Sequence, residues 1–551
     1  MSRARQWFRS SPSSAPGTDT VPRVLHRALL SRRQALAGIS ALGGMALLGS
    51  ALRGPAAAQT THEPHSLFPD LGATPTWLSY VPADLAEPDV WTSTDGELRG
   101  DLRLAYATQE IGGYTLNLRG YNGAIPGPTL RLQPGDRLAL TLTNALPPNP
   151  DPMPENHNLP HHFNTTNFHS HGLHVSPEGE SDNVFRAMEP GGQYDIIIDI
   201  PADHPSGTFW YHPHHHGAVD AQLTSGVFGA LIVEGDFADI PEITAAQERV
   251  LMLQEVLFDY LGQIEHYDTL WPEAVPRFLA VNGQREPIMR MRPGEVQRWR
   301  ILHAGYQDDI LMSLDGHTLL PIARDGIRLS EIGDSVGVTQ PASVGEAPPE
   351  AILFAPGQRV DVLVQAGEPG EYLLQALPYF QGYDAPTGPI AHVIVEGEPM
   401  TMALPTALPP APFADITDDE LTGSREILFS RHAPEVDAAG HWREFAFLVD
   451  NQLFDMNVVG QTIDLNAVEE WTITSSDEHN DHVFHIHVNP FQLVKVNGEP
   501  VEPIWLDTVI VPHGGSVTFR TRFLDFTGKY VLHCHMMNHE ELGMMQVVEV
   551  V

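Results

Sequence analysis

The sequence contains very little cysteine and little positive charge. Cys534 is the only cysteine in 551 residues, so no disulfide can form within the chain. Lys and Arg together number 31 against 70 Asp and Glu, which gives a formal net charge of −39, and Lys495 and Lys529 are the only lysines. A chain this negative repels phosphate backbones. We therefore expect no nucleic-acid partner.

Long apolar stretches are also scarce. After the first 58 residues, no segment is long and apolar enough to span a membrane as a helix. The chain is 42% hydrophobic and has 47 glycines and 47 prolines, a composition that favours short strands joined by turns over long helices. At roughly 100–200 residues per domain, its length predicts about three domains.

The first 58 residues resemble an export signal. Basic residues lead into Ser31-Arg32-Arg33-Gln34-Ala35-Leu36, a Gly- and Ala-rich apolar run follows to about Leu52, and Ala56-Ala57-Ala58 offers a cleavage site. The paired arginines resemble a twin-arginine (Tat) signal. We predict a signal peptide over residues 1–58 and a periplasmic or extracellular mature protein, with an uncleaved membrane anchor as the alternative.

Export changes the interpretation of the single cysteine. Exported chains use cysteines in pairs, so a lone thiol is either buried and inert or bound to something. Histidines on both sides of Cys534 favour binding. Thirteen of the 28 histidines fall into four short clusters, which are FHSHGLH (168–174), FWYHPHHHG (209–217), DHVFHIHVNPF (481–491) and HCHMMNHEELGMM (533–545).

The His-x-His spacing predicts metal binding. Alternate residues of a strand point to one face, so each His-x-His pair directs two imidazoles at one ion. Imidazole with thiolate selects zinc or copper over calcium or magnesium. In the last cluster, the histidines on either side of Cys534 share one face and the thiolate takes the other, which predicts two centres. The donors on the thiolate side are Cys534, His482, His539 and Met544. This set describes a blue-copper electron-transfer centre, whereas structural zinc usually has more cysteines.

The four clusters, in this order and spacing, resemble those of the multicopper oxidases, a family of laccase-like, three-domain enzymes. The resemblance covers about residues 65–551. It extends to YNGAIPGPTLRLQPGD (121–136), which is similar to a first-domain signature, and FAPGQRVDVLV (354–364), which is similar to a second-domain one. It implies an all-β fold of three cupredoxin-like Greek-key β-sandwich domains. The implied cofactor is copper, four ions per chain, of which one is type 1, one type 2 and two type 3.

Carried over by position, the resemblance also implies a ligand set. The type 1 copper falls to His482, Cys534 and His539, with Met544 as axial ligand. The type 2 copper falls to His169 and His485. The type 3 pair falls to His171, His212, His214, His487, His533 and His535. The remaining histidines near these clusters are expected to support the ligands or to face solvent, with an accessory metal site as an alternative for the last three, and they are His174, His215, His216, His157, His161 and His162.

Internal repeats support three domains. Asn122-Gly123 precedes LRLQPGDRLALTLTN, Asn282-Gly283 precedes MRMRPGEVQRWRILH, and a weaker echo begins near Asn451. We predict sandwiches over residues 59–236, 237–403 and 404–551, with a Pro-rich linker at the start of the third. Because the implied ligands come only from the first and third, the middle sandwich is expected to act as a spacer.

The resemblance implies an oxidase with O2 as acceptor and a small-molecule reductant as partner. His539 would be the solvent-facing ligand through which electrons enter. Glu540 and Asp182 match positions of proton-relay carboxylates, with Glu180 as a competitor for the second. We expect one-electron oxidation of phenols or aromatic amines, coupled to the four-electron reduction of O2 to water.

Three alternatives stay open. A metallo-oxidase acting on Mn(II), Fe(II) or Cu(I) is one, although the scattered methionines disfavour a dedicated Cu(I) oxidase. A copper-free scaffold is another, and the complete ligand set argues against it. A copper nitrite reductase would usually be shorter and lack the full His-x-His set. The sequence leaves the oligomeric state open.

Overall fold

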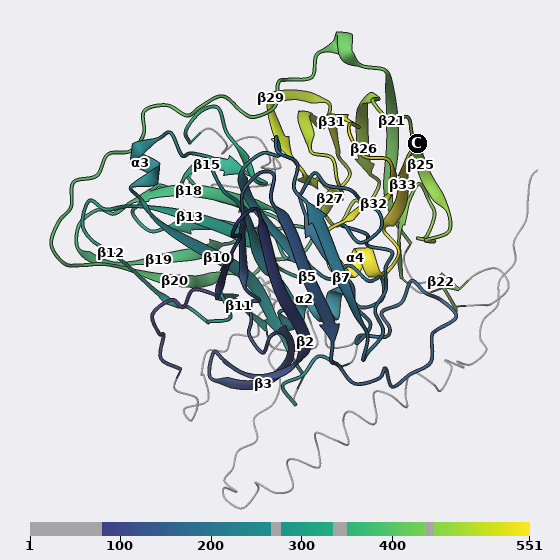
Figure 1. The fold of residues 1–551 in the computed structure, drawn as a ribbon, viewed down its shortest axis with the longest axis horizontal. Coiled ribbons are helices and arrows are strands. Elements are labelled where there is room, and N and C mark those ends of the chain that lie inside the picture. The colour runs from purple at the N-terminus through teal and green to yellow at the C-terminus, as the bar shows by residue number, and fades with distance from the viewer. Residues whose placement is uncertain are drawn as a thin grey trace, which may run out of the picture. The chain divides into compact units, whose positions relative to one another are not determined.

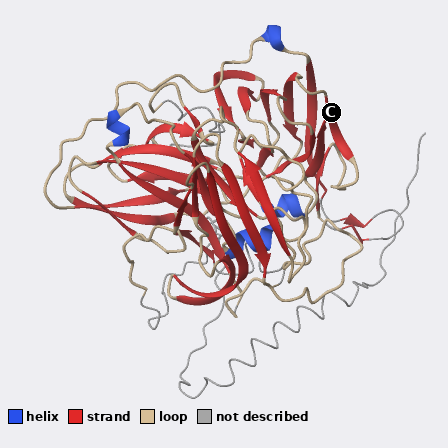
Figure 2. Cartoon of the chain, in the orientation of Figure 1, coloured by secondary structure: helices blue, strands red, loops and turns tan. Residues whose placement is uncertain are grey.

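The computed structural model describes residues 80–259, 261–265, 277–333, 350–432, 435–436, 442–443 and 445–551. The predicted signal peptide lies outside these residues. Strands make up almost all regular structure in the described part (Figures 1 and 2). They form three successive pairs of large sheets, which confirms the predicted all-β class and three β-sandwiches.

The first sandwich combines a four-stranded and a five-stranded sheet. The four-stranded sheet has the order β3-β2-β5-β7, with strands β2 Glu97–Ile111, β3 Tyr114–Tyr121, β5 Arg137–Asn144 and β7 Gln193–Asp199. The other has the order β1-β4-β9-β8-β6, with strands β1 Val90–Thr92, β4 Thr129–Leu132, β6 His169–His171, β8 Gly207–His212 and β9 Gly229–Val233. Leucines from both sheets, such as Leu138 and Leu231, share one buried core.

The second sandwich pairs a six-stranded with a five-stranded sheet. The first has the order β11-β10-β13-β18-β15-β16, with strands β10 Gln247–Leu257, β11 Arg277–Val281, β13 Val296–His303, β15 Leu320–Arg324, β16 Ile327–Arg328 and β18 Arg359–Gln365. The second has the order β12-β20-β19-β14-β17, with strands β12 Ile288–Met291, β14 Ile310–Leu314, β17 Ile352–Phe354, β19 Gly370–Leu377 and β20 Gly388–Val395. Trp299 and Ile390 lie in the core between them.

The third sandwich repeats this arrangement. Its six-stranded sheet has the order β24-β21-β26-β31-β28-β29, with strands β21 Gly423–His432, β24 Ala446–Val449, β26 Val468–Ser475, β28 Phe491–Val496, β29 Glu499–Leu506 and β31 Ser516–Arg522. Its five-stranded sheet has the order β25-β33-β32-β27-β30, with strands β25 Val459–Ile463, β27 His482–Ile486, β30 Thr508–Val511, β32 Gly528–Cys534 and β33 Met545–Val550. A separate two-stranded ribbon joins β22 Glu435–Val436 to β23 Trp442–Arg443.

The helices in the described residues are short. They are α2 Val219–Ser225, α3 Pro241–Thr244, α4 Met537–Glu541 and a 3-10 turn at Asp418–Glu420. None of the helices described has the length and hydrophobicity needed to cross a membrane. The predicted domain boundaries at 236/237 and 403/404 stay predictions.

The three sequence repeats build the same turn. The turn lies beside an equivalent pair of parallel strands in each sandwich. These pairs are β2 with β5, β10 with β13, and β21 with β26. The turn residues Asn122, Asn282 and Asp450 all have positive φ. The side-chain oxygen of each accepts a hydrogen bond from a strand N–H, at 2.8, 2.9 and 2.9 Å respectively. Asn and Asp suit this conformation because their short polar side chains bond locally.

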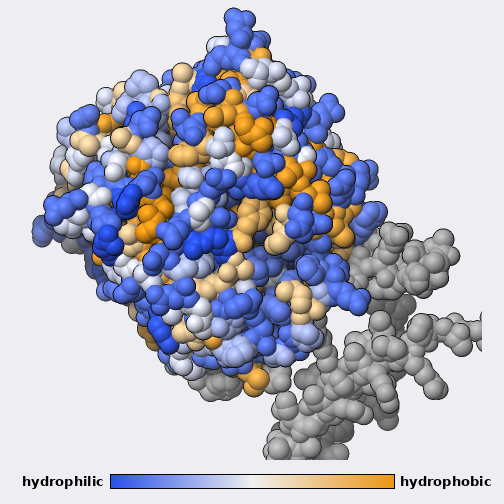
Figure 3. Space-filling model, turned by 45° about the vertical axis from the view of Figure 1, so that its right-hand side comes forward, coloured by the Kyte–Doolittle hydropathy of each residue, from blue (hydrophilic) through white to orange (hydrophobic). Residues whose placement is uncertain are grey.

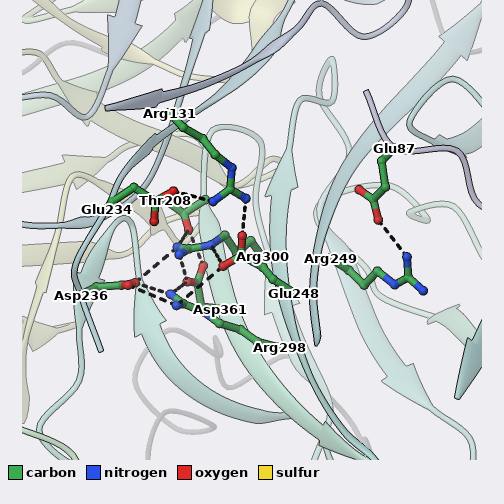
Figure 4. Close-up of polar contacts among 10 residues, drawn as sticks. All are labelled: Glu87, Arg131, Thr208, Glu234, Asp236, Glu248, Arg249, Arg298, Arg300 and Asp361. Carbon is green, nitrogen blue, oxygen red and sulfur yellow. Dashed lines mark hydrogen bonds and ion pairs between the residues drawn. The ribbon is translucent and has the colours of Figure 1, made fainter. Parts of the chain in front are cut away.

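A buried ionic network joins the first and second sandwiches (Figure 4). Arg300 on β13 donates to Asp361 on β18 at 3.0 Å and to Thr208 on β8 at 2.7 Å. The remaining members of the network are Arg131, Glu234, Asp236, Glu248 and Arg298. Buried ion pairs pay a large desolvation cost, so they tolerate few other arrangements. The network therefore fixes how these two sandwiches contact each other.

The surface is mainly hydrophilic. Figure 3 shows hydrophilic side chains over much of the displayed face, with apolar patches between them. The exposed large hydrophobic residues of the described part are Val81, Val90, Met153, Leu261, Phe380, Leu453, Met456, Val458, Leu524 and Val551. On the displayed face, hydrophilic side chains thus surround the apolar patches.

Candidate metal centre

Each outer sandwich places two histidine-bearing strands side by side. In the first, β6 pairs antiparallel with β8, and His169 lies opposite His212. In the third, β27 pairs antiparallel with β32, and His485 lies opposite His533. The clusters at 168–174 and 481–491 thus meet the clusters that follow them in sequence by ordinary strand pairing.

The histidines of the first and third sandwiches contact each other directly. The rings of His169 and His487 stack with centroids 3.8 Å apart, and those of His171 and His485 also stack at 3.8 Å. Eight buried imidazoles meet in this way, and we call them the histidine cluster: His169, His171, His212, His214, His485, His487, His533 and His535.

Several ring nitrogens of the histidine cluster have no hydrogen-bond partner. They are His169 Nε2, His171 Nδ1, His212 Nε2, His485 Nε2, His487 Nε2 and both nitrogens of His535. Leaving buried polar atoms unpaired is costly, so such a concentration requires an explanation. The donor nitrogens of three groups lie within 4.8 Å of one another, and these groups are His169/His171/His212, His169/His485/His487 and His214/His487/His533. This donor set fits transition-metal ions that imidazole binds well.

Burial also favours the neutral form of several of these imidazoles. It lowers the pKa of His212 to about 3 and that of His214 to about 4. The pKa values of His169 and His171 lie well below the usual range, mainly because of burial and secondarily because of neighbouring imidazoles. A metal binds the neutral ring. The protein therefore presents the binding form at neutral pH.

A second donor group surrounds Cys534. Its Sγ lies 3.8 Å from His482 Nδ1 and 3.6 Å from His539 Nδ1, and these two nitrogens are 3.0 Å apart. The fourth expected donor, Met544, is fully buried, and its backbone N–H donates to the His539 carbonyl at 2.9 Å. Burial raises the pKa of Cys534 to about 12. A thiolate here consequently needs a compensating positive charge, which a metal ion supplies.

Both expected relay carboxylates are buried against the histidine cluster. The Asp182 oxygens lie 3.0 and 3.1 Å from His169 Nδ1, whereas Glu180 is exposed. Burial raises the pKa of Asp182 to about 7. Glu540 on α4 lies with Oε2 2.9 Å from His533 Nδ1 and Oε1 3.6 Å from His214 Nδ1.

The two carboxylates differ in their electrostatics. Burial alone would raise the pKa of Glu540, but its interactions with the neighbouring His533 and His214 side chains lower it to about 2. The Glu540 carboxylate thus faces the Nδ1 atoms of these rings, whose Nε2 atoms face each other at 3.1 Å. Such contacts orient metal-binding histidines.

His539 does not face solvent as expected. Only 2% of the residue is exposed. Phe447 on β24, the edge strand of the six-stranded sheet, covers it, with the two rings stacked at 3.8 Å and 22°. The backbone N–H of Phe447 donates to the Leu542 carbonyl at 3.1 Å, which fixes this cover to the loop that carries His539.

The other clustered histidines make ordinary contacts. His174 Nδ1 bonds the Val488 carbonyl at 2.8 Å, and His216 Nε2 lies 3.1 Å from Asn158 Oδ1. Among the described residues, no potential metal group includes any of the histidines outside the expected ligand set, namely His157, His161, His162, His174, His215 and His216. The alternative of an accessory metal site in the loop gains no support.

Sequence reasoning missed one carboxylate of the site. Asp507, directly after β29, is buried, and its Oδ1 lies 3.3 Å from His171 Nε2. Its donor oxygen and one ring nitrogen each of His171 and His485 all lie within 4.8 Å of one another. No His or Cys stands beside it in the sequence, so spacing gave no signal for it.

Comparisons with known proteins agree with this arrangement. Family models described as multicopper oxidase match residues 156–237, 259–399 and 429–551. A laccase of Bacillus stratosphericus is 23% identical over 491 residues, which is 78% of this chain and 90% of that protein. The cell division protein FtsP of Escherichia coli is 24% identical over 405 residues, 71% of this chain and 76% of that protein.

A solved structure shows the same fold. The multicopper oxidase from Campylobacter jejuni, described as a metallo-oxidase, superimposes with a TM-score of 0.69 at 22% identity and covers 86% of this chain and 96% of that one. The likeness confirms three cupredoxin-like sandwiches. With three domain models matched along it and a buried set of imidazole and thiolate donors, the chain belongs to the multicopper oxidase family.

Proposed function

We propose that the chain is a laccase-like oxidase, which takes single electrons from phenols or aromatic amines and passes them to O2 to form water. The observation that carries the proposal is the group of unpartnered imidazole nitrogens directly next in sequence to a buried cysteine with two imidazoles of its own. Copper bound in these sites supplies one-electron redox chemistry. About four such ions would match the four electrons that O2 needs to become water.

The proposed division of donors follows the two groups. The type 1 copper would be held by His482, Cys534, His539 and Met544. His169 and His485 would hold the type 2 copper. The type 3 pair would lie on His171, His212, His214, His487, His533 and His535. The histidines next to Cys534 belong to the second group, so the chain itself links the two by a covalent route on the order of 10 Å.

Protons would reach the histidine cluster through buried carboxylates. Asp182 and Glu540 are proposed for this role because each is buried and contacts an Nδ1 atom of the cluster. Exposure of Glu180 supports Asp182 in preference to it. The same contacts hold the rings in place, so orientation and proton transfer need separate readouts.

The reductant is the least determined part of the proposal. Met536, Met537, Met544 and Met545 are all buried, so they offer no exposed thioether site for Cu(I). Oxidation of Mn(II) or Fe(II) is the second candidate, because the similar C. jejuni structure is described as a metallo-oxidase. A copper-free scaffold would not need a complete set of unpartnered donors.

Oxygen uptake and copper content test the proposal together. The purified, copper-loaded protein is expected to hold about four copper ions per chain and to consume O2 with phenols or aromatic amines, without accumulating hydrogen peroxide. If O2 is consumed with Mn(II), Fe(II) or Cu(I) but with none of the aromatic reductants, the protein is a metallo-oxidase and the laccase-like proposal is wrong. Absence of bound copper would leave only the scaffold.

The thiolate assignment predicts a blue protein whose colour depends on Cys534. Cys534→Ser removes the sulfur-to-metal charge transfer, so the visible band is expected to disappear while copper stays bound to the histidine cluster. Absorption spectroscopy with copper analysis measures both. Met545→Leu is the control, because Met545 packs with Val184 and Val531 away from Cys534 and should keep the colour. A blue Cys534→Ser variant would refute the assignment.

The relay assignment predicts that electron entry and proton delivery fail separately. Glu540→Gln and Asp182→Asn keep an oxygen acceptor at each ring but remove the titratable group. The blue band should bleach with reductant at close to the parent rate, then return in air about 10²–10⁴-fold more slowly. Stopped-flow absorption measures both phases, and copper analysis shows whether the rings still bind metal.

Two further variants complete this test. Glu180→Gln is the matched control for Asp182→Asn and should reoxidise normally because Glu180 is exposed. His539→Ala should cripple bleaching rather than reoxidation, since it removes a donor beside Cys534. Normal reoxidation in both carboxylate variants, with copper retained, would remove Glu540 and Asp182 from the relay.

A further inference from the structure

The segment 354–364 of the second sandwich packs directly against the histidine cluster. It runs from the end of β17 through a turn into β18. At Gly357 in this turn, where φ is +87°, a Cβ would lie 3.0 Å from ring carbons of His535. The neighbouring Gln358 donates through Nε2 to the Thr508 carbonyl at 3.1 Å. The expectation that the middle sandwich is only a spacer is therefore wrong, because its backbone contacts one of the cluster imidazoles.

Arg359, at the first position of β18, extends this contact. Its side chain is fully buried, and its two terminal nitrogens donate to both carboxylate oxygens of Asp507 at 2.7 and 2.6 Å. Its Nε donates to the Thr208 carbonyl at 3.1 Å. Arg359 thus links the second sandwich to the third through Asp507 and to the first through Thr208. A bidentate pair of this kind fixes the carboxylate in direction as well as in position.

Asp507 in turn contacts two cluster histidines with two different groups. Its carboxylate Oδ1 lies 3.3 Å from His171 Nε2, and its backbone carbonyl accepts from His485 Nδ1 at 2.7 Å. These contacts leave His171 Nδ1 and His485 Nε2 as the nitrogens available for metal. Both atoms are buried and have no partner. The tautomer and direction of each ring therefore follow from where Asp507 is held.

The pair also packs against the chain that leaves His171. At Gly172, where φ is +89°, a Cβ would overlap Arg359 Nη2 and lie 2.6 Å from Asp507 Oδ2. Only a glycine lets the Arg359–Asp507 pair approach this closely. The close approach of the Arg359–Asp507 pair to the backbone at Gly172 therefore indicates that the pair has a fixed position.

We propose that Arg359 is a positioning residue for the histidine cluster, acting through Asp507. By occupying both carboxylate oxygens, Arg359 keeps Asp507 a hydrogen-bond acceptor that orients His171 and His485, and prevents it from becoming a copper ligand itself. The donor atoms of Asp507, His171 and His485 all lie within 4.8 Å of one another. Asp507 is therefore close enough to compete with the two histidines for the metal. The inference rests on the proposed copper occupancy of the cluster.

Arg359→Met tests the proposal, because Met fills much of the same space without a charged fork. The blue band is expected to persist, which reports an intact fold and Cys534 centre. The type 2 copper signal in electron paramagnetic resonance should change its hyperfine splitting. Copper in the histidine cluster should also become about 10–100-fold easier to remove with a chelator. Arg359→Lys should lie between parent and Arg359→Met, since a lysine keeps the charge but cannot form the two-pronged contact.

Arg300→Lys is the matched control. Arg300 is equally buried and bonds carboxylates between sandwiches in the network of Figure 4, but its hydrogen bonds within the described part go to Glu248, Thr208, Asp236 and Asp361 rather than to a cluster histidine. Its variant should leave the resonance signal and the chelator sensitivity at parent values. An identical change in the Arg300 and Arg359 variants would reduce Arg359 to a general packing role and overturn the proposal.

A double-mutant cycle with Asp507→Asn completes the experiment. Asn keeps an acceptor oxygen but loses the charge, so adding Arg359→Met to it should change chelator sensitivity little, as expected of two residues acting through one contact. Additive effects would overturn the proposal. If Arg359→Met yields no blue protein, Asp507→Asn alone must alter the type 2 signal for the proposal to stand. Fewer than about four coppers in the parent would instead contradict the proposed function.

Discussion

Burying ten imidazoles together is the constraint on which the rest of the structure depends. Every ring nitrogen taken out of water needs a partner, and the protein supplies partners for only one side of most rings. Carboxylates and carbonyls occupy the outer nitrogens, as Asp182 does for His169 and the Asp507 carbonyl does for His485. Most of the inner nitrogens of the histidine cluster have no hydrogen-bond partner among the described residues. The geometry is consequently that of a site completed by metal.

This constraint also explains why three sandwiches contribute. The first and third each provide four of the eight rings of the histidine cluster, so these two must contact each other without a gap. Glu541 on α4 secures that contact, because its carboxylate accepts from Gly217 and from Val219, whose N–H lies 2.6 Å away, at the start of α2. The second sandwich contacts the same region through Gly357 and Arg359, and the buried network around Arg300 fixes it to the first. The histidine cluster is therefore held from three sides.

The sequence pattern marked the histidines that lie together in the structure, but it did not reveal the residues that surround them. Pairs such as His169 and His171 could be recognised because a strand repeats every two residues, so a short local pattern carries the geometry. Asp507 and Arg359 act across 148 positions of the chain as single residues of common types, and no local pattern marks them. The choice of Asp182 over Glu180 depends on the path of a loop, where no period applies. The burial of His539 depends on Phe447, which lies 92 positions before it, and spacing could not reveal that cover.

The long separation in sequence between the two halves of the histidine cluster has a consequence for how the protein matures. His214 and His533 contact each other across 319 positions, and β32 and α4 near the end of the chain complete the site. A ribosome-bound chain that stops short of β32 has formed the first sandwich but still lacks His533 and His535 of the histidine cluster, together with Cys534. Metal insertion must then follow synthesis and docking of the third sandwich, so it is a late step in biogenesis and one that a prematurely terminated chain cannot reach.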